Sequence, residues 1–410
     1  MMVMAHRISA MLRITVLVVL AGLSACRKQE SSVTDAREPI QFNCSQVEVT
    51  TKADGSYVTD DMLVTGKHFA VYAWDTGDEF LSEDPYTDFG APAFMNNLDV
   101  TYQNNSDKGK NNTYTGDYFW PLTSTPPYCY SFLAYYPYAA GSGITAPTFS
   151  AGNVGVYAFT AKDEAKDMVD FCVSDVSNDI VYGTTYTAYP GTVGLTFRHT
   201  LTRVQVKFVK AADVDEDTHI YIEDAKLVNI RKRGTLTATY AQFIDNVSDP
   251  ANPQVRPGIG LKGTTTLNWA TDPDIKGNYE LSIGGVDPNP AADPDPIDVD
   301  LDYTQTVRSD EVFLMVPQAI LKVDEPLGDP SPQAISFRWR VGNAEASDAT
   351  LILDECVKAV GSVERAGITA WAPNMSVVYT VVIKAKPIEF AITASIREWE
   401  DEDGYYTIIP

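Results

Sequence analysis

The chain has 410 residues, of which 44% are hydrophobic, 11% aromatic and 21% charged, a composition typical of a globular protein. It carries 31 Lys and Arg against 55 Asp and Glu, a formal net charge of −24. Such an acidic surface repels phosphate backbones and anionic lipid headgroups, which excludes nucleic-acid binding and a basic membrane-facing surface. The length predicts two or three domains.

The N-terminal segment has the organisation of an export signal. A basic region precedes ten apolar residues, 14–23, a run too short to span a bilayer but typical of a secretory signal peptide. The following Leu23-Ser24-Ala25-Cys26 resembles a bacterial lipobox. We therefore expect cleavage between Ala25 and Cys26, removal of signal peptide 1–25, and acylation of the Cys26 thiol with palmitate or a similar chain. The alternative is an ordinary signal peptide cleaved near Ala25.

The remaining cysteines and histidines do not form a metal-binding pattern, because they lie far apart and include no CxxC pair. They are Cys44, Cys129, Cys172, Cys356, His68, His199 and His219. We expect no metal site and no cofactor. Export permits disulfides, but their pairing cannot be deduced, and buried free thiols are the other interpretation.

Residues 26–39 are polar and predict a flexible tether. From Ile40 onwards the hydrophobic period is two, and short runs rich in Val, Ile, Thr, Tyr and Phe alternate with turn-forming clusters, which predicts an all-β fold. The clearest predicted strands are 68–74, 128–138, 204–208, 220–230 and 388–396. Residues 161–168 predict at most one or two helical turns.

The phase of this alternation changes near Thr202 and Arg203, which indicates a bulge or a strand break. We therefore predict a domain boundary in the turn at 189–191, just before it, giving an N-terminal domain 40–192 and a C-terminal domain 193–410. The acidic, proline-rich segment 286–302 predicts an irregular surface loop.

No catalytic motif is present: GxSxG, HExxH, GxGxxG and the P-loop pattern are all missing from the sequence, so we predict that the protein is not an enzyme. His199 alternates with Phe197 and Leu201 and is interpreted as a hydrogen-bonded structural histidine. The acidic clusters 213–217, 293–302 and 401–403 lack the EF-hand spacing and are interpreted as solvated turns. The aromatic stretch 114–120 suits either a core or a sugar-stacking surface.

Several motifs together resemble the fimbrillins of Bacteroidales, the FimA- and Mfa-type subunits of type V pili. The resemblance covers nearly the whole mature chain in the order of the family. It rests on FNCSQVEVTTKA at 42–53, YFWP at 118–121, FLAYYP at 132–137, FRHTLTRV at 197–204, VFLMVPQ at 312–318 and the terminal strand pair 379–399.

The resemblance implies two transthyretin-like β-sandwich domains in tandem, export as an outer-membrane lipoprotein, and a place in surface fimbriae that support cell adhesion. In polymerising members a protease, usually Arg-specific, removes the first strand. A strand from another fimbrial subunit, of the same or a related kind, then enters the groove. The physical basis is sound, because an inserted strand satisfies unpaired backbone groups and buries apolar side chains.

Residues 40–53 are the predicted exchangeable strand, with Ile40, Phe42, Val47 and Val49 as its strand-forming residues. The expected processing site is Lys52-Ala53, where polymerising relatives have arginine. Whether Lys52 is cleaved is left open by the sequence. The position of the subunit as stalk, tip or anchor, and its adhesion ligand, are open as well.

The predicted donor strand is the C-terminal region 388–410, because its alternation presents one apolar face near a free chain end. Its candidate residues are Ile388, Phe390, Ile392, Ile396 and Trp399. The alternative function is a surface lipoprotein that binds glycans or a host ligand and does not polymerise.

Overall fold

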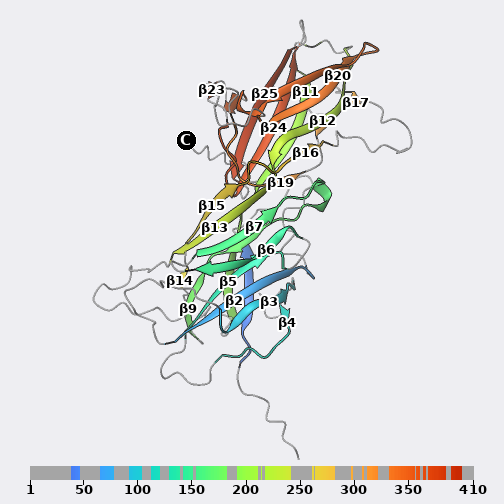
Figure 1. Ribbon diagram of the computed structural model, residues 1–410. Coiled ribbons are helices and arrows are strands. Elements are labelled where there is room, and N and C mark those ends of the chain that lie inside the picture. The colour runs from blue at the N-terminus through green and yellow to red at the C-terminus, as the bar shows by residue number, and fades with distance from the viewer. Residues whose placement is uncertain are drawn as a thin grey trace, which may run out of the picture. The chain divides into compact units, whose positions relative to one another are not determined.

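A computed structural model describes residues 38–46, 65–77, 92–103, 112–120, 129–138, 142–150, 154–181, 192–210, 214, 218–241, 261–262, 264–281, 297–298, 307–308, 312–321, 332–355, 357–360, 363–365, 368–384 and 389–398 (Figure 1). The described residues are almost entirely β-strand, which confirms the all-β prediction. Two 3₁₀ turns, η1 (Ala165–Asp167) and η2 (Leu353–Glu355), complete the described elements. No described helix is long and apolar enough to cross a membrane.

The first two sheets contain strands from distant parts of the chain. The nine-stranded sheet has the order β1-β10-β8-β5-β2-β3-β4, with β9 on β5 and β14 on β9, and the four-stranded sheet has the order β15-β13-β7-β6. The bounds of the nine strands are β1 (Gln41–Gln46), β2 (His68–Gly77), β3 (Met95–Thr101), β4 (Thr113–Tyr114), β5 (Cys129–Tyr136), β8 (Cys172–Ser174), β9 (Ser177–Val181), β10 (Thr192–His199) and β14 (Leu261–Lys262). Those of the four are β6 (Ile144–Ser150), β7 (Val154–Thr160), β13 (Arg233–Ala241) and β15 (Thr264–Thr271).

The other two sheets are built from the later part of the chain. The seven-stranded sheet has the order β18-β11-β24-β25-β22-β23, with β19 on β11, and the five-stranded sheet has the order β16-β12-β20-β21, with β17 on β12. The bounds of the seven are β11 (Thr202–Lys210), β18 (Val307–Arg308), β19 (Phe313–Met315), β22 (Val357–Val360), β23 (Val363–Arg365), β24 (Met375–Lys384) and β25 (Glu389–Glu398). Those of the five are β12 (Ile220–Arg231), β16 (Lys276–Glu280), β17 (Ile297–Asp298), β20 (Ala334–Val341) and β21 (Ser347–Ile352).

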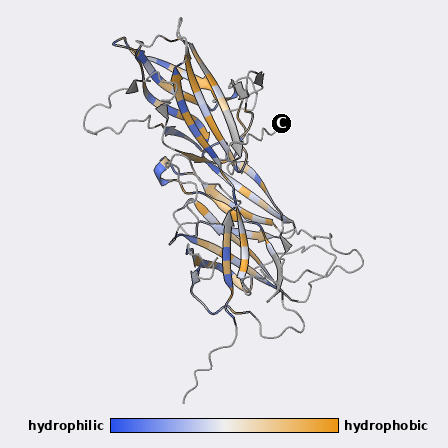
Figure 2. Cartoon of the chain, turned by 180° about the vertical axis from the view of Figure 1, so that it is seen from behind, coloured by the Kyte–Doolittle hydropathy of each residue, from blue (hydrophilic) through white to orange (hydrophobic). Residues whose placement is uncertain are grey.

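Each pair of sheets encloses a hydrophobic core and forms a β-sandwich. In the first sandwich, Tyr72 and Leu133 of the nine-stranded sheet share a core with Tyr157 and Leu236 of the four-stranded sheet. In the second sandwich, the seven- and five-stranded sheets share another core. Along the strands, hydrophobic residues alternate with more polar ones (Figure 2), the pattern expected where one strand face is buried.

The nine-stranded sheet departs from this pattern because both of its faces are buried. Alternate residues of β2, such as Tyr72 and Val71, belong to different cores, and the same holds for Leu133 and Phe132 of β5. The core on the second face, called the outer core below, also contains Trp120. Burial on both faces explains why these two segments are nearly continuous hydrophobic runs.

The predicted strand break is present, since β10 ends at His199 and β11 begins at Thr202 in a different sheet. The strands do not divide at residue 192, however. β10 pairs with β1 and β8, and β13 pairs with β7 (Figure 1). The chain therefore enters the second sandwich after β10, returns to the first for β13 and β15, and then goes back.

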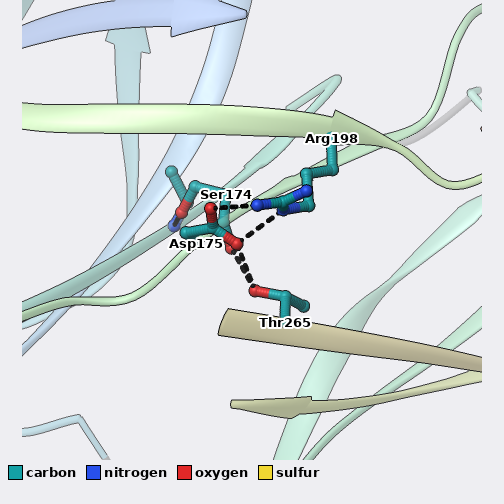
Figure 3. Close-up of polar contacts among 5 residues, drawn as sticks. Ser174, Asp175, Arg198 and Thr265 are labelled. Carbon is teal, nitrogen blue, oxygen red and sulfur yellow. Dashed lines mark hydrogen bonds and ion pairs between the residues drawn. The ribbon is translucent and has the colours of Figure 1, made fainter. Parts of the chain in front are cut away.

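A polar network links the two sheets of the first sandwich. The guanidinium of Arg198 in β10 donates to both carboxylate oxygens of Asp175, at 2.8 and 2.9 Å, and the Thr265 hydroxyl of β15 donates to the same carboxylate at 2.8 Å. Figure 3 shows these groups converging on Asp175. The Asp175 side chain is 7% exposed. The hydroxyl of the neighbouring Ser174 accepts a hydrogen bond from the Ala134 main-chain N–H.

We expect Asp175→Ala to lower the free energy of unfolding by about 2–3 kcal/mol, because it removes the nearly buried carboxylate that accepts hydrogen bonds from the Arg198 guanidinium and the Thr265 hydroxyl. Urea denaturation of the purified chain measures this change. The matched control is Asp348→Ala, since Asp348 is 86% exposed and 3.6 Å from Arg338; we expect a change within about 0.5 kcal/mol. Equal effects of both variants would contradict a stabilising role for the network.

Candidate functional site

The first described strand, β1, lies at one end of the nine-stranded sheet. It runs parallel to β10, in a register from Gln41 opposite Thr192 to Gln46 opposite Phe197. The main-chain ladder of β1 is therefore made to β10 on one side. A strand at a sheet edge is the kind that another segment can replace, because only one ladder must be broken.

The inward side chains of β1 and of Ile40 directly before it belong to the outer core. Ile40 and Phe42 have no exposed surface. The Phe42 ring meets Tyr114 and Phe132 edge to face, each at 6.0 Å between ring centroids. Burying one such aromatic side chain contributes about 1.5–3 kcal/mol, so the space filled by β1 would be apolar and costly if left empty.

Residues 112–118 hold the opposite edge of β1, and we call Asn112, Tyr114 and Tyr118 the edge latch. The Asn112 amide donates to the Phe42 carbonyl at 3.0 Å, and the Tyr114 hydroxyl donates to the Ile40 carbonyl at 2.6 Å. The Ile40 main-chain N–H donates to the Tyr118 carbonyl at 3.0 Å. Each of these three bonds is made to a main-chain atom of Ile40 or Phe42, so any extended segment in this place would supply the same partners; the Asn112 amide also lies 3.8 Å from the Cys44 sulfur.

Asn112 is itself fixed in place. Its side chain is almost fully buried, and its carbonyl oxygen accepts from the Gln103 main-chain N–H at 2.8 Å. Sequence reasoning did not identify this residue, because a single asparagine beside turn-forming residues carries no signal for a contact with a strand 70 positions away. Tyr114 was noted only as part of the aromatic stretch 114–120.

Burial, with a smaller contribution from Tyr118, raises the pKa of Tyr114 to about 12. A tyrosine whose pKa is higher in the folded chain than the usual value of about 10 keeps its full stabilising effect below pH 10. That effect is lost as the pH rises from about 10 to about 12, when the hydroxyl that donates to Ile40 loses its proton.

We expect Tyr114→Phe to reduce stability at neutral pH by about 1–2 kcal/mol, because the Ile40 carbonyl loses its donor. The variant should also lose less stability than the parent chain between pH 10 and 12. Urea denaturation across this pH range gives both results. Tyr118→Phe is the matched control, since Tyr118 meets β1 through its main-chain oxygen. A parent and a Tyr114→Phe variant of equal stability at every pH would contradict a role for this hydroxyl.

The other residues of the predicted exchangeable strand and its processing site lie outside the described part of the chain. These are Val47, Val49, Lys52 and Ala53, and the same holds for Ala25 and Cys26 at the predicted lipidation site. The structure therefore places Phe42 in the edge strand β1 and Ile40 directly before it, while the cleavage and lipidation sites stay predictions.

The predicted donor region lies mainly in β25, which is an integral strand of the second sandwich. β25 pairs with β24 at every position from Met375 opposite Glu398 to Lys384 opposite Glu389, and with β22 on its other side. Ile392 is 7% exposed and belongs to the core of that sandwich, and Phe390 packs against the same core. Ile396 lies in the strand, whereas Ile388 and Trp399 fall outside the described residues.

The aromatic stretch 114–120 packs on the outer core. Trp120 is 1% exposed, and Tyr114 and Tyr118 contact the same core, so this stretch is not an open sugar-stacking surface. Among the described cysteines, Cys44 and Cys172 are free thiols; burial raises the pKa of both. Of the acidic clusters, the structure describes residue 214 in 213–217 and β17 in 293–302, whereas 401–403 lies outside the described residues.

These features define a structural β-sandwich protein whose N-terminal edge strand is held by side chains. The chain belongs to the fimbrillin-like family, whose model matches residues 51–399, and it is a structural protein rather than an enzyme. No curated protein matches the chain.

Two solved structures illustrate the similarity. A fimbrial protein from Bacteroides vulgatus has a TM-score of 0.50 and 16% identity, over 88% of this chain and 99% of that one. The tip fimbrial protein Mfa3 from Porphyromonas gingivalis has a TM-score of 0.38 and 10% identity, over 88% of this chain and 99% of that one. At this identity, the first similarity concerns the fold alone.

Proposed function

We propose that the chain is a subunit of surface fimbriae that supports adhesion and joins neighbouring subunits by strand exchange at β1. The observation that carries this proposal is the construction of β1 itself. It is an edge strand that, with Ile40 directly before it, fills an apolar space, and the Asn112 amide and the Tyr114 hydroxyl donate to main-chain carbonyls of Phe42 and Ile40. A foreign strand with suitable side chains would find the same ladder and the same latch.

Cleavage after Lys52 would separate β1 from the rest of the chain, because Lys52 follows β1 and precedes β2. The vacated space would expose the β10 edge and the apolar rings around Phe42. An incoming strand would therefore bind tightly, through ladder hydrogen bonds and burial of alternate side chains at about 25 cal/mol per Å².

We place the donor in residues 399–410 rather than in β25. Donation of β25 would break its ladder with β24 and remove Ile392 from the core of the second sandwich. The segment after β25 contains Tyr405, Tyr406 and Ile408. Tyr406 and Ile408 have the spacing of Ile40 and Phe42, which are two residues apart on one strand face.

Limited digestion of the purified mature chain with a lysine-specific protease tests the proposal. We expect cleavage after Lys52, followed by oligomers that survive detergent and mild heating on gels and appear as fibres by electron microscopy. Lys52→Gln should stay uncut at this site and monomeric. Lys52→Arg should become sensitive to an arginine-specific protease. A chain trimmed at residue 52 that stays monomeric at high concentration would contradict strand acceptance.

Deleting residues 404–410 separates the two roles. This variant should still accept strands from the trimmed parent chain but should not form polymers alone. If it polymerises as well as the parent does, the donor is not in this segment.

We further propose that the subunit is an outer-membrane lipoprotein anchored through Cys26. The multiple acyl chains typical of bacterial lipoproteins anchor firmly, whereas one chain holds only marginally. Palmitate labelling of cells that express the parent chain and Cys26→Ala tests this anchor. Label on the parent alone supports it, and an unlabelled parent would contradict it.

The domain organisation also follows from the sheets rather than from a single cut in the chain. We propose that one sandwich domain comprises residues 40–199 with 233–271, and that the other comprises residues 202–231 with 276–398. This division keeps β10 with β1 and β8, and it keeps β13 with β7.

A further inference from the structure

Three side chains of different ligand chemistry converge at the nine-stranded sheet, where Cys172 is part of the outer core. Cys172 begins β8 and His199 ends β10, and the two are direct cross-strand partners. Asp170 lies two residues before Cys172. Because side chains two residues apart in extended chain lie on the same face, the sheet brings all three together.

The distances among their ligand atoms are short. The Cys172 sulfur lies 3.1 Å from Oδ2 of Asp170 and 3.6 Å from Nδ1 of His199, and that nitrogen lies 2.5 Å from the same oxygen. Tetrahedral coordination of zinc at bond lengths of about 2.0–2.3 Å separates ligand atoms by roughly 3.2–3.8 Å. Two of the three separations are already close to this range, and the His199–Asp170 hydrogen bond would have to open by less than about 1 Å.

The environment of the cluster favours a bound cation. Asp170 is 3%, Cys172 0% and His199 2% exposed. The Oδ2 oxygen of Asp170 makes the contacts with both Cys172 and His199. The Oδ1 oxygen of the same carboxylate is buried and has no hydrogen-bond partner. A buried carboxylate oxygen without a partner costs free energy. A cation coordinated by both oxygens of this carboxylate would satisfy Oδ1 and supply a fourth donor atom.

The charges also balance around a divalent ion. A carboxylate, a thiolate and a neutral imidazole carry two negative charges in total, which a divalent cation cancels, so no net charge is buried. Binding would release the thiol proton of Cys172 to solvent as the sulfur–metal bond forms. Sulfur, nitrogen and oxygen ligands in one site suit zinc rather than calcium or magnesium.

We propose that Asp170, Cys172 and His199 form a structural zinc site that ties β8 to β10. The burial of all three ligands favours a closed structural site over a catalytic one, which keeps an open position for water or substrate. The ion would stiffen the strand β10 to which β1 is paired. The sequence pattern gave no sign of it, because Cys172 and His199 are separated by 27 positions.

The test begins with the mature full-length chain refolded with and without zinc chloride, since buried ligands load most readily during folding. After gel filtration, elemental analysis should find one zinc ion per parent chain. Removal of zinc with a strong chelator should lower the midpoint of thermal unfolding by several degrees. Replacement by cobalt should produce a thiolate-to-cobalt absorption band. Cys172→Ser should lose that band, while Cys44→Ser, which changes the other described free thiol, should keep it and keep the zinc.

Two results would overturn the proposal. One is a folded parent chain that retains no zinc and whose unfolding does not respond to the chelator; the three residues would then be a hydrogen-bonded cluster only. The other is a cobalt band that persists in Cys172→Ser, which would place the ion elsewhere. Because the absorption band and the metal content are measured on the parent chain first, a failure of the variant to fold does not prevent the test.

Discussion

Phe42→Ala is expected to release β1 from the first sandwich without unfolding the rest of the chain. The substitution removes the ring that contacts Tyr114 and Phe132 in a position without exposed surface, at a cost of about 3–5 kcal/mol. Because β1 is an edge strand, most of this cost falls on its local detachment. A loss of this size corresponds to amide exchange about 100- to 4,000-fold faster in β1, since each 1.4 kcal/mol is a factor of ten.

Hydrogen exchange followed by mass spectrometry of peptides covering residues 41–46 measures this effect. The matched control is Asn43→Ala, which changes the neighbouring residue on the opposite strand face and should alter exchange little. If peptides from β1 exchange equally in the parent chain and in Phe42→Ala, the ring does not hold the strand. If β1 detaches in Phe42→Ala, this variant should also accept a donor strand without prior cleavage. Gels of mixed subunits can detect such acceptance.

The sequence predicted those parts of the fold that depend on local pattern. The alternation in 388–396 predicted the strand that the structure shows as β25, and the change of phase near Thr202 predicted the break between β10 and β11. Both features arise from the period-two burial of neighbouring residues, so no knowledge of distant partners was needed.

The pairing of strands could not be predicted in the same way. β1 pairs with β10, and β13 pairs with β7, across long separations in the chain. Such contacts are decided by packing and by the closing of long loops, and they leave little trace in either segment alone. The predicted boundary after residue 192 was placed at a turn signal, whereas the sheets keep β10 with the strands that come before that turn.

The candidate site was predictable on one side only. Ile40 and Phe42 carry the strand pattern, so their inward burial could be anticipated. The other half of the site consists of Asn112 and the Tyr114 hydroxyl, polar groups that bind main-chain atoms of β1. A polar residue at a strand edge has no periodic pattern, and its partner is visible only in three dimensions.

The second large effect is expected at Gln318, which ends the VFLMVPQ segment. Its side-chain oxygen accepts from the Arg231 main-chain N–H at 3.0 Å, and its side-chain nitrogen donates to the main-chain carbonyls of Arg231 and Val316 at 3.1 and 3.0 Å. Its own main chain exchanges two hydrogen bonds with Trp371. The amide therefore takes the place of a neighbouring strand at the end of β12.

Gln318→Leu should lower the free energy of unfolding by about 3–4 kcal/mol at any pH between 4 and 8, because it leaves these main-chain groups without their partners. Gln318→Glu should cost at least as much at pH 8, where a carboxylate would face two carbonyl oxygens. Those oxygens and burial raise the pKa of the new carboxyl above its usual value of about 4.3. A protonated carboxyl can donate again, so Gln318→Glu should regain stability as the pH falls through this raised pKa.

Urea denaturation at several pH values between 4 and 8 distinguishes the two variants. Each is compared with the parent chain at the same pH, so that the titration of other carboxylates cancels. Gln318→Leu is the matched control because its side chain does not titrate, and its deficit relative to the parent should not change with pH. A deficit of Gln318→Glu that also stays constant would contradict donation by the residue at this position. Deficits below about 1 kcal/mol in both variants would show that the Gln318 amide does not hold the end of β12.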